Sequence, residues 1–75
     1  MRKHDLTSLQ LFVLVCDTRN IARAAEQAHM VSSAISKRLV QLEEAFGTQL
    51  LVRQRYGVMP TAAGETLLEH ARAVL

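Results

Sequence analysis

The chain has 75 residues, of which 49% are hydrophobic and 21% are charged, and its formal net charge at pH 7 is +2. This length allows one small domain, which buries only about 60% of the surface of its unfolded chain. The composition is that of a folded domain rather than a disordered segment, and no stretch approaches the roughly 20 apolar residues that a membrane helix needs.

Positive charge gathers in the middle of the chain. Residues 31–60 hold four Lys or Arg against two Glu, whereas residues 61–75 hold one Arg against two Glu. A basic stretch of this kind suits a polyanionic partner. We therefore expect the middle of the chain to contact such a partner.

A first helix is predicted to begin between Asp5 and Ser8. Thr7-Ser8-Leu9-Gln10 has the pattern of a capping box, in which a hydroxyl at the cap is followed three residues later by Gln. A buried strand is the competing interpretation of the apolar run, but the cap and the absence of flanking Gly or Pro favour a helix. Two apolar flanks predict that this helix is covered on two sides. They consist of Leu9, Phe12, Val13 and Cys16, and of Leu11, Leu14 and Val15.

The stretch from Met1 to Cys16 superficially imitates a bacterial lipoprotein signal, with basic residues, an apolar run and then a cysteine. Asp5 and Gln10 interrupt the run, and Val15 stands where a small residue is needed before the cysteine. We therefore expect a cytoplasmic protein. A single cysteine cannot form an internal disulfide, so Cys16 is predicted to be a small core residue.

Two helices separated by a three-residue turn follow. Asn20 suits the N-cap of a helix over residues 21–28, whose alanine-rich face lets another backbone approach closely. The second helix is predicted from Ser32 to Phe46, and Gly47 favours its end because glycine adopts the left-handed conformation without a Cβ penalty. The apolar positions of the two helices are Ile21, Ala24, Ala25 and Ala28, and Ile35, Leu39, Leu42 and Phe46.

A short hairpin and a fourth helix complete the pattern. Two apolar runs, residues 50–52 and 58–59, flank a polar tip ending at Tyr56-Gly57, which predicts a hairpin that Pro60 closes. Thr61 then caps a helix whose first turn carries Glu65. Its apolar face runs on to the last residue of the chain, so we expect a helix cut from a longer protein. That face consists of Leu67, Leu68, Ala71, Val74 and Leu75.

The second of the paired helices carries polar residues on its first turns, away from its apolar stripe. In a helix-turn-helix, this second helix enters the major groove and its N-terminal residues contact base edges. Small hydroxyls let the helix lie deep in the groove, and a lysine reaches guanine acceptors or phosphates. The sequence therefore predicts double-stranded DNA as the partner. The residues predicted to contact it from this helix are Ser32, Ser33, Ser36, Lys37 and Arg38.

The hairpin tip adds Arg53 and Arg55, which suit the DNA backbone or the minor groove beside the helix. Simpler roles remain open for several of these residues. Ser32 and Ser33 could only cap their helix, and Arg38 could be a surface cation. Arg53 could hold the hairpin through carbonyl oxygens, and Tyr56 could pack against the hairpin.

Catalysis and metal binding find no support in the sequence. His4, His29 and His70 are too dispersed for a metal site, and no serine has a base and an oxyanion donor nearby. Glu43 and Glu44 are adjacent on a helix, so their side chains diverge, and we expect them to be solvated or paired with surface cations. No glycine-rich phosphate loop occurs. We expect no enzyme activity and no cofactor.

At this point the order of elements and the residues together resemble the N-terminal winged helix-turn-helix domain of LysR-type transcriptional regulators. The matching stretches are DLTSLQLFVLV, ARAAEQAHMVSSAISKRLVQLEEAFGTQLLVR and GVMPTAAGETLLEHAR, so the resemblance covers essentially the whole chain. The string AISKRLVQLEEAFGTQLLVR followed by Thr-x-Ala-Gly is specific. The chain departs from the family where Val31-Ser32-Ser33 replaces Ser-Gln-Pro, and we expect Ser32 to take over the capping role.

The resemblance implies a mainly α fold with a three-helix core, a short β-hairpin wing and a fourth helix that links and dimerises. Residues 1–60 would form the DNA-binding domain, with the helix-turn-helix at about 21–40 and the wing at about 50–60. Residues 61–75 would begin a truncated linker helix. It implies a bacterial regulator that binds an interrupted palindrome as a homodimer, or as a tetramer at full length. A small-molecule effector would bind only a C-terminal domain that this chain lacks.

Two other functions compete with sequence-specific DNA binding. The two-sided first helix and the open stripe of the fourth suit a helical dimerisation or docking module. Non-specific nucleic-acid binding predicts an affinity governed by salt without sequence preference. The few aromatic residues argue against single-stranded nucleic acid as the main ligand. We expect weak DNA binding by the isolated chain, because dimerisation through a truncated helix would be incomplete.

Overall fold

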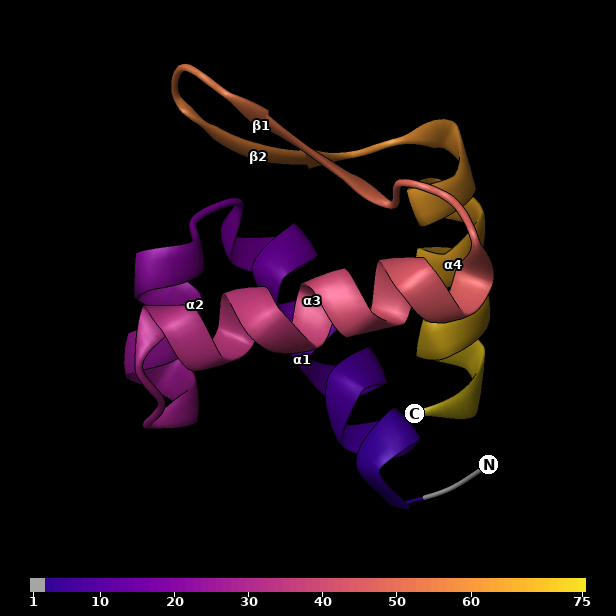
Figure 1. Ribbon diagram of the computed structural model, residues 1–75, viewed down its shortest axis with the longest axis horizontal. Coiled ribbons are helices and arrows are strands. Elements are labelled where there is room, and N and C mark those ends of the chain that lie inside the picture. The colour runs from indigo at the N-terminus through magenta and orange to yellow at the C-terminus, as the bar shows by residue number, and fades with distance from the viewer. Residues whose placement is uncertain (1–2) are drawn as a thin grey trace.

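Helices dominate the part of the chain that the structure describes (Figure 1). The computed structural model describes the backbone of residues 3–75 and the side chains from residue 6 onward, so the basic start at Met1 and Arg2 lies outside the described residues. The predicted order of three helices, a hairpin and a fourth helix is confirmed. The elements are α1 (Lys3–Thr18), α2 (Ile21–Ala28), α3 (Ser32–Phe46), β1 (Leu51–Gln54), β2 (Gly57–Pro60) and α4 (Ala62–Val74).

The first helix begins earlier than its predicted start between Asp5 and Ser8. Because α1 starts at Lys3, Thr7 and Ser8 lie inside it and Ser8 is buried. The capping-box interpretation is therefore wrong. No Gly or Pro interrupts residues 3–8, and extending an existing helix costs far less than nucleating one, so the helix continues through the hydroxyl pair.

The helix α1 is covered on two sides, as its two apolar flanks predict. Cys16 is buried, and this burial, together with the neighbouring Asp17 carboxylate, raises the pKa of its thiol to about 11. Cys16 is therefore the small core residue that the sequence predicts. The buried apolar residues of α1 are Leu9, Leu11, Phe12, Val15 and Cys16.

The paired helices α2 and α3 have the predicted bounds. The Asn20 side chain accepts a hydrogen bond from the Arg23 backbone amide at 2.9 Å, which caps α2. His29 ends α2 in the left-handed conformation, with φ 56°, and Gly47 ends α3 with φ 69°. Ala24 and Ala25 are buried, so the small face of α2 does admit a close neighbour. These contacts set the turn at residues 29–31 between the two helices.

The core lies where α1, α2 and α3 meet and extends to the hairpin and α4. In Figure 1, α3 crosses in front of α1. Leu50 and Val58 bring the hairpin into the same core, and Ala71 brings α4. Phe46 differs from the prediction, because this last residue of the α3 stripe is exposed at the edge of the core. The buried residues of α3 are Ile35, Leu39 and Leu42.

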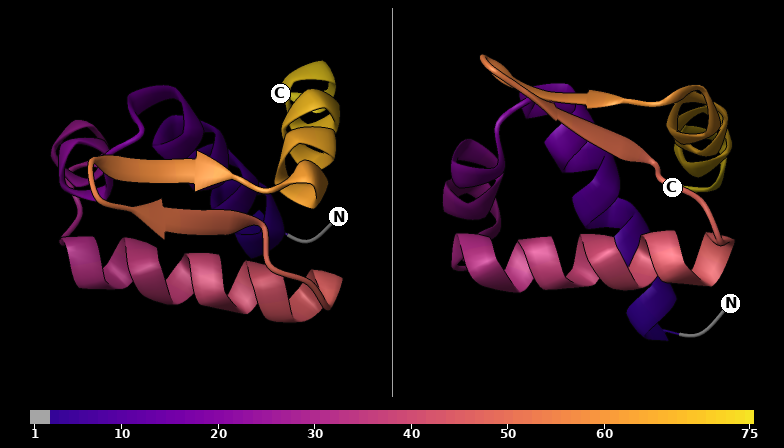
Figure 2. Two further views of the ribbon diagram at one scale, coloured as in Figure 1. Left: turned by 90° about the horizontal axis from the view of Figure 1, so that it is seen from above. Right: turned by 45° about the horizontal axis from the view of Figure 1, so that its top comes forward.

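The hairpin is antiparallel, with Arg53 opposite Val58 and Gln54 opposite Gly57. Viewed from above, it runs alongside α3 (Figure 2). The backbone amide of Val58 donates to the Arg19 carbonyl oxygen at 3.0 Å, which ties β2 to the loop between α1 and α2. Gly57 has φ 145°, and a Cβ at this position would collide with the same carbonyl. The close approach therefore requires glycine.

The start of α4 is fixed by Thr61, as predicted. Its hydroxyl oxygen accepts from the Gly64 amide at 3.0 Å and its hydroxyl group donates to the Gln49 carbonyl at 2.7 Å. A Cβ on Gly64 would overlap the Leu50 carbonyl. The cap thus joins α4 to the segment that leads into the hairpin.

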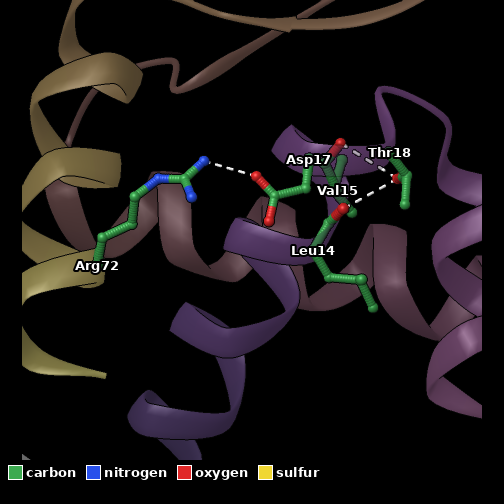
Figure 3. Close-up of polar contacts among 5 residues, drawn as sticks. All are labelled: Leu14, Val15, Asp17, Thr18 and Arg72. Carbon is green, nitrogen blue, oxygen red and sulfur yellow. Dashed lines mark hydrogen bonds and ion pairs between the residues drawn. The ribbon is translucent and has the colours of Figure 1, made fainter.

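The fourth helix packs against α1 across an exposed ion pair. The Arg72 guanidinium of α4 donates to the Asp17 carboxylate of α1 at 2.6 Å, and the nearby Thr18 hydroxyl donates to the Leu14 carbonyl at 2.9 Å (Figure 3). An exposed pair of this kind contributes about 0.2–1 kcal/mol. Val74 remains exposed, so the predicted apolar face of α4 is not covered at its end.

Among residues 3–75 there is no helix that is both long and apolar enough to cross a bilayer.

Candidate nucleic-acid interface

The first turn of α3 differs from the predicted capping arrangement. Val31, not Ser32, occupies the N-cap position, with φ −79° and ψ 148°, and no side chain caps the helix. The Val31 carbonyl accepts from the amides of Ala34 and Ile35. The expectation that Ser32 caps the helix is therefore wrong, because Ser32 is already the first helical residue. The hydroxyls of Ser32 and Ser33 belong to exposed side chains at the open end of the helix.

The second turn of α3 spreads its polar residues around the helix. Ser36 is half-buried, Lys37 is exposed and Arg38 is half-buried. Successive residues point about 100° apart around a helix of 3.6 residues per turn. The three side chains therefore do not share one direction, and Arg38 points away from the side that carries Ser36.

The hairpin meets α3 at two residues that were each predicted to contact DNA. The Arg53 guanidinium Nη2 donates to the Ser36 hydroxyl oxygen at 3.3 Å, across 17 positions of sequence. Arg53 thus contacts a side chain of α3, rather than the carbonyl oxygens considered as the alternative. Since both residues stay accessible, the bond places an arginine beside the outer face of the helix without burying its charge.

The turn of the hairpin carries Arg55 and Tyr56, and both are exposed. The Arg55 guanidinium carbon lies 5.6 Å from the centre of the Tyr56 ring. Tyr56 is 91% exposed, so it does not pack against the hairpin. An arginine and a phenol project from the tip, where a backbone phosphate can approach both.

The hairpin is anchored by a residue whose role the sequence did not predict. Glu43 Oε2 accepts from the backbone amides of Leu50 and Leu51, at 2.7 and 3.1 Å. The expectation that Glu43 is solvated or paired with a surface cation is wrong, because its carboxylate binds the amides at the entry of β1. Glu44 is exposed, as expected. No local pattern marks Glu43, since its partners lie seven and eight positions later.

The predicted residues divide into those that the structure brings together and those that it leaves separate. Ser36 and Arg53 are in contact. Ser32, Ser33 and Lys37 stand exposed on the first two turns of α3, Arg55 stands at the hairpin tip and Arg38 lies on another side of the helix. Basic side chains therefore flank the outer face of α3 on the hairpin side, which is the charge arrangement that phosphates require.

Metal binding has no candidate among the described residues. Within the part of the chain that the structure describes, no group of three or more His, Cys, Asp or Glu is placed to hold an ion. His29 ends α2 and His70 lies on α4. The side chain of His4, the third histidine considered above, lies outside the described part.

Comparison with protein families identifies one match that covers most of the chain. The model of the family described as "Bacterial regulatory helix-turn-helix protein, lysR family" matches residues 6–65. The nitrogen assimilation regulatory protein nac of Klebsiella aerogenes is 39% identical over 71 residues, which is 95% of this chain and 23% of that protein. The HTH-type transcriptional regulator HdfR of Escherichia coli is 41% identical over 71 residues, 95% of this chain and 25% of that protein.

Solved structures give the same likeness. The crystal structure of the CbnR DNA-binding domain in complex with DNA has a TM-score of 0.89 and 34% identity, and the match covers 99% of this chain and 82% of that one. The complex of the BenM DNA-binding domain with catB site 1 DNA has a TM-score of 0.89 and 28% identity, over 99% and 79% of the two chains. The chain spans about a quarter of the length of the curated relatives it matches.

Proposed function

This chain belongs to the lysR family of bacterial regulatory helix-turn-helix proteins, and we propose that it binds double-stranded DNA sequence-specifically as the DNA-binding domain of a transcription regulator. Two structural neighbours are DNA-binding domains of this fold in complex with DNA. The observation that carries the proposal is the Ser36–Arg53 hydrogen bond, which joins α3 and the hairpin into one accessible surface.

The serines and the lysine of α3 would contact base edges in the major groove. Ser32, Ser33 and Lys37 are exposed on the first two turns, and small hydroxyls allow close approach to the bases. The amides of the first turn lack a side-chain cap, which favours a nearby phosphate oxygen as their partner. Ser36 would contribute from the side that faces the hairpin.

The arginines would contact the DNA backbone. Arg53 and Arg55 extend from the hairpin, which we assign as the wing, beside the face of α3 that enters the groove. Arg38 points away from the wing and would contact a phosphate on the other wall of the groove. Each such contact releases counterions, so the affinity should fall steeply with salt.

The domain division and the assembly belong to the same proposal. Residues 1–60 would form the winged DNA-binding domain and residues 61–75 the start of a linker helix, with a separate effector domain in the full-length protein. Val74 and Leu75 leave an apolar surface on α4, which supports homodimer formation through this helix, and a tetramer at full length. A cytoplasmic location follows from the need to reach the bacterial chromosome. The proposal includes no catalytic step.

Selection from a random pool of duplexes at near-physiological salt tests the proposal. Enrichment of a short motif, above all two inverted copies at fixed spacing, is expected for a dimeric reader. Recovery of DNA without a motif would reduce the protein to a non-specific binder. No recovery at all would favour a helical docking module, a second function that the exposed end of α4 supports.

A further inference from the structure

An apolar residue continues the polar row on the outer face of α3. Val40 is 53% exposed and follows Ser36 by four positions and Lys37 by three. Residues three and four apart lie on the same face of a helix, so Val40 extends the surface that begins with these two side chains. A single exposed valine is ordinary on a protein surface. Val40 is nevertheless a candidate for DNA contact, because it lies beside the proposed base-reading residues.

A groove of about 390 Å³ opens between α3 and the wing, and Val40 lines it. Val52 lines the same groove from β1 and is itself 38% exposed. The Ser36–Arg53 hydrogen bond lies at this groove as well, since both residues line it. The groove therefore has an apolar part formed by the two valines next to a polar, basic part.

Charge limits where DNA can lie along α3. Lys37 and Arg53 supply positive charge on either side of Val40, whereas Glu44, one turn further on, is exposed and negative. The Glu43 carboxylate accepts hydrogen bonds from two wing amides, which offset its charge. Polyanion contact along the helix is therefore favourable as far as Val40 and unfavourable beyond it.

We propose that Val40 reads a thymine through the C5-methyl group in the major groove. This inference rests on the proposed function and names one base that the site prefers. The thymine methyl is the apolar group that base pairs present in the major groove, where an aliphatic side chain can cover it. Ser36 and Lys37 supply hydrogen bonds, and Val40 supplies the apolar contact that requires an A·T pair at its position.

The test replaces thymines one at a time by deoxyuridine in a duplex that the chain has selected from the random pool. Deoxyuridine pairs as thymine does and lacks only the methyl group. With the unaltered chain, one position in each half-site should lose affinity about fourfold, the effect of burying one methyl group. With Val40→Ala, the same substitution should have no effect, because the partner of the methyl group is gone.

A matched control variant shows whether the effect is specific to Val40. Phe46→Ala truncates another exposed apolar side chain, at the far end of the same helix, and it should leave the sensitivity to deoxyuridine as in the unaltered chain. A selected motif that is insensitive at every thymine, or equally sensitive with Val40→Ala, would overturn the assignment of Val40 and leave the proposed function intact. A pool without any motif would overturn both.

Discussion

The helix-turn-helix and the wing differ in what determines their geometry. The helix-turn-helix is set by neighbours in sequence: the Asn20 side chain caps an amide three positions later, and His29 and Gly47 end their helices in left-handed conformations. The wing is set by distant partners. Glu43 binds its first amides, and the Arg19 carbonyl accepts from Val58.

This difference predicts how mutations act on the two regions. A change in the helix-turn-helix should alter either the local stability or the DNA contacts, because its caps and its outward residues are separate groups. A change in the wing should alter both, since the proposed DNA contact of Arg53 requires that the wing stays anchored to α3 and to the loop after α1. Single substitutions in the two regions test this difference.

The largest effect is expected from Ser36→Glu, where the two regions meet. A carboxylate here would repel phosphates and pair with Arg53, whose guanidinium already donates to this side chain. DNA affinity should fall about 100-fold or more, since a like charge at an interface costs several kcal/mol. Fluorescence anisotropy with the selected duplex measures it, and circular dichroism checks that the fold persists.

Ser36→Ala is the matched control for that loss. It removes the hydroxyl without adding charge, so the affinity should fall less than about tenfold. Dimerisation should be unchanged by both variants, because Ser36 lies near the start of α3 and its side chain bonds to the hairpin rather than to α4. Unchanged DNA affinity with Ser36→Glu would refute the assignment of this face to DNA.

Gly57→Ala tests the anchoring of the wing. A methyl group at Gly57 would collide with the Arg19 carbonyl in a backbone conformation that favours glycine, so the free energy of unfolding should fall by about 2 kcal/mol. The displaced wing should also lose phosphate contacts, which lowers the slope of log affinity against log salt. Denaturant unfolding and a salt titration measure the two effects.

Gly47→Ala separates strain from collision. Gly47 also has positive φ, but nothing lies within 4 Å of the position that a Cβ would take. The cost should be only about 1 kcal/mol, from the left-handed conformation alone, with an unchanged salt slope. Equal effects of the two variants on the salt slope would mean that the wing does not depend on its contact with Arg19.

The sequence predicted the helix-turn-helix better than the wing, because local patterns determine the first and distant contacts determine the second. The bounds of α2 and α3 were predicted correctly from Asn20, Gly47 and the apolar periodicity. The hairpin was predicted from its apolar runs and Tyr56-Gly57, but its anchors were not, because no short-range pattern links Glu43 to amides seven and eight positions later. The capping box at Thr7 misled for the opposite reason, since a local signal was overridden by a helix that extends through it.

The residues of the candidate site also differ in whether a local pattern or only the folded structure places them. Outward placement of Ser33 and Lys37 follows from helical periodicity, so it was predictable from residue spacing. The contact between Ser36 and Arg53 depends on the path of the hairpin, which only the folded structure gives. Exposure of Val40 beside the wing groove belongs to this second class as well.

Glu43→Gln should have a moderate effect that is confined to the wing. The amide oxygen of Gln can still accept from Leu50 or Leu51, but it loses the charge that strengthens both bonds. The free energy of unfolding should fall by about 1 kcal/mol. Glu44→Gln is the matched control, because Glu44 is exposed, and should change stability by less than about 0.5 kcal/mol. Equal stabilities of the two variants would show that the carboxylate does not anchor β1.

The smallest effect is expected at His29, within the helix-turn-helix. His29 has φ 56°, a conformation that glycine adopts freely, so His29→Gly should relieve about 1 kcal/mol of strain. Greater freedom of the unfolded chain offsets about half of this gain. The net rise of about 0.5 kcal/mol corresponds to about 3 °C in thermal midpoint. Gln27→Gly, two residues earlier and inside α2, should instead lower the free energy of unfolding by about 1 kcal/mol. DNA affinity should stay unchanged in His29→Gly, since the backbone of residue 29 already holds the geometry of the turn. A weaker affinity would mean that the imidazole itself contacts DNA. One residue of the helix-turn-helix would then both end a helix and bind DNA.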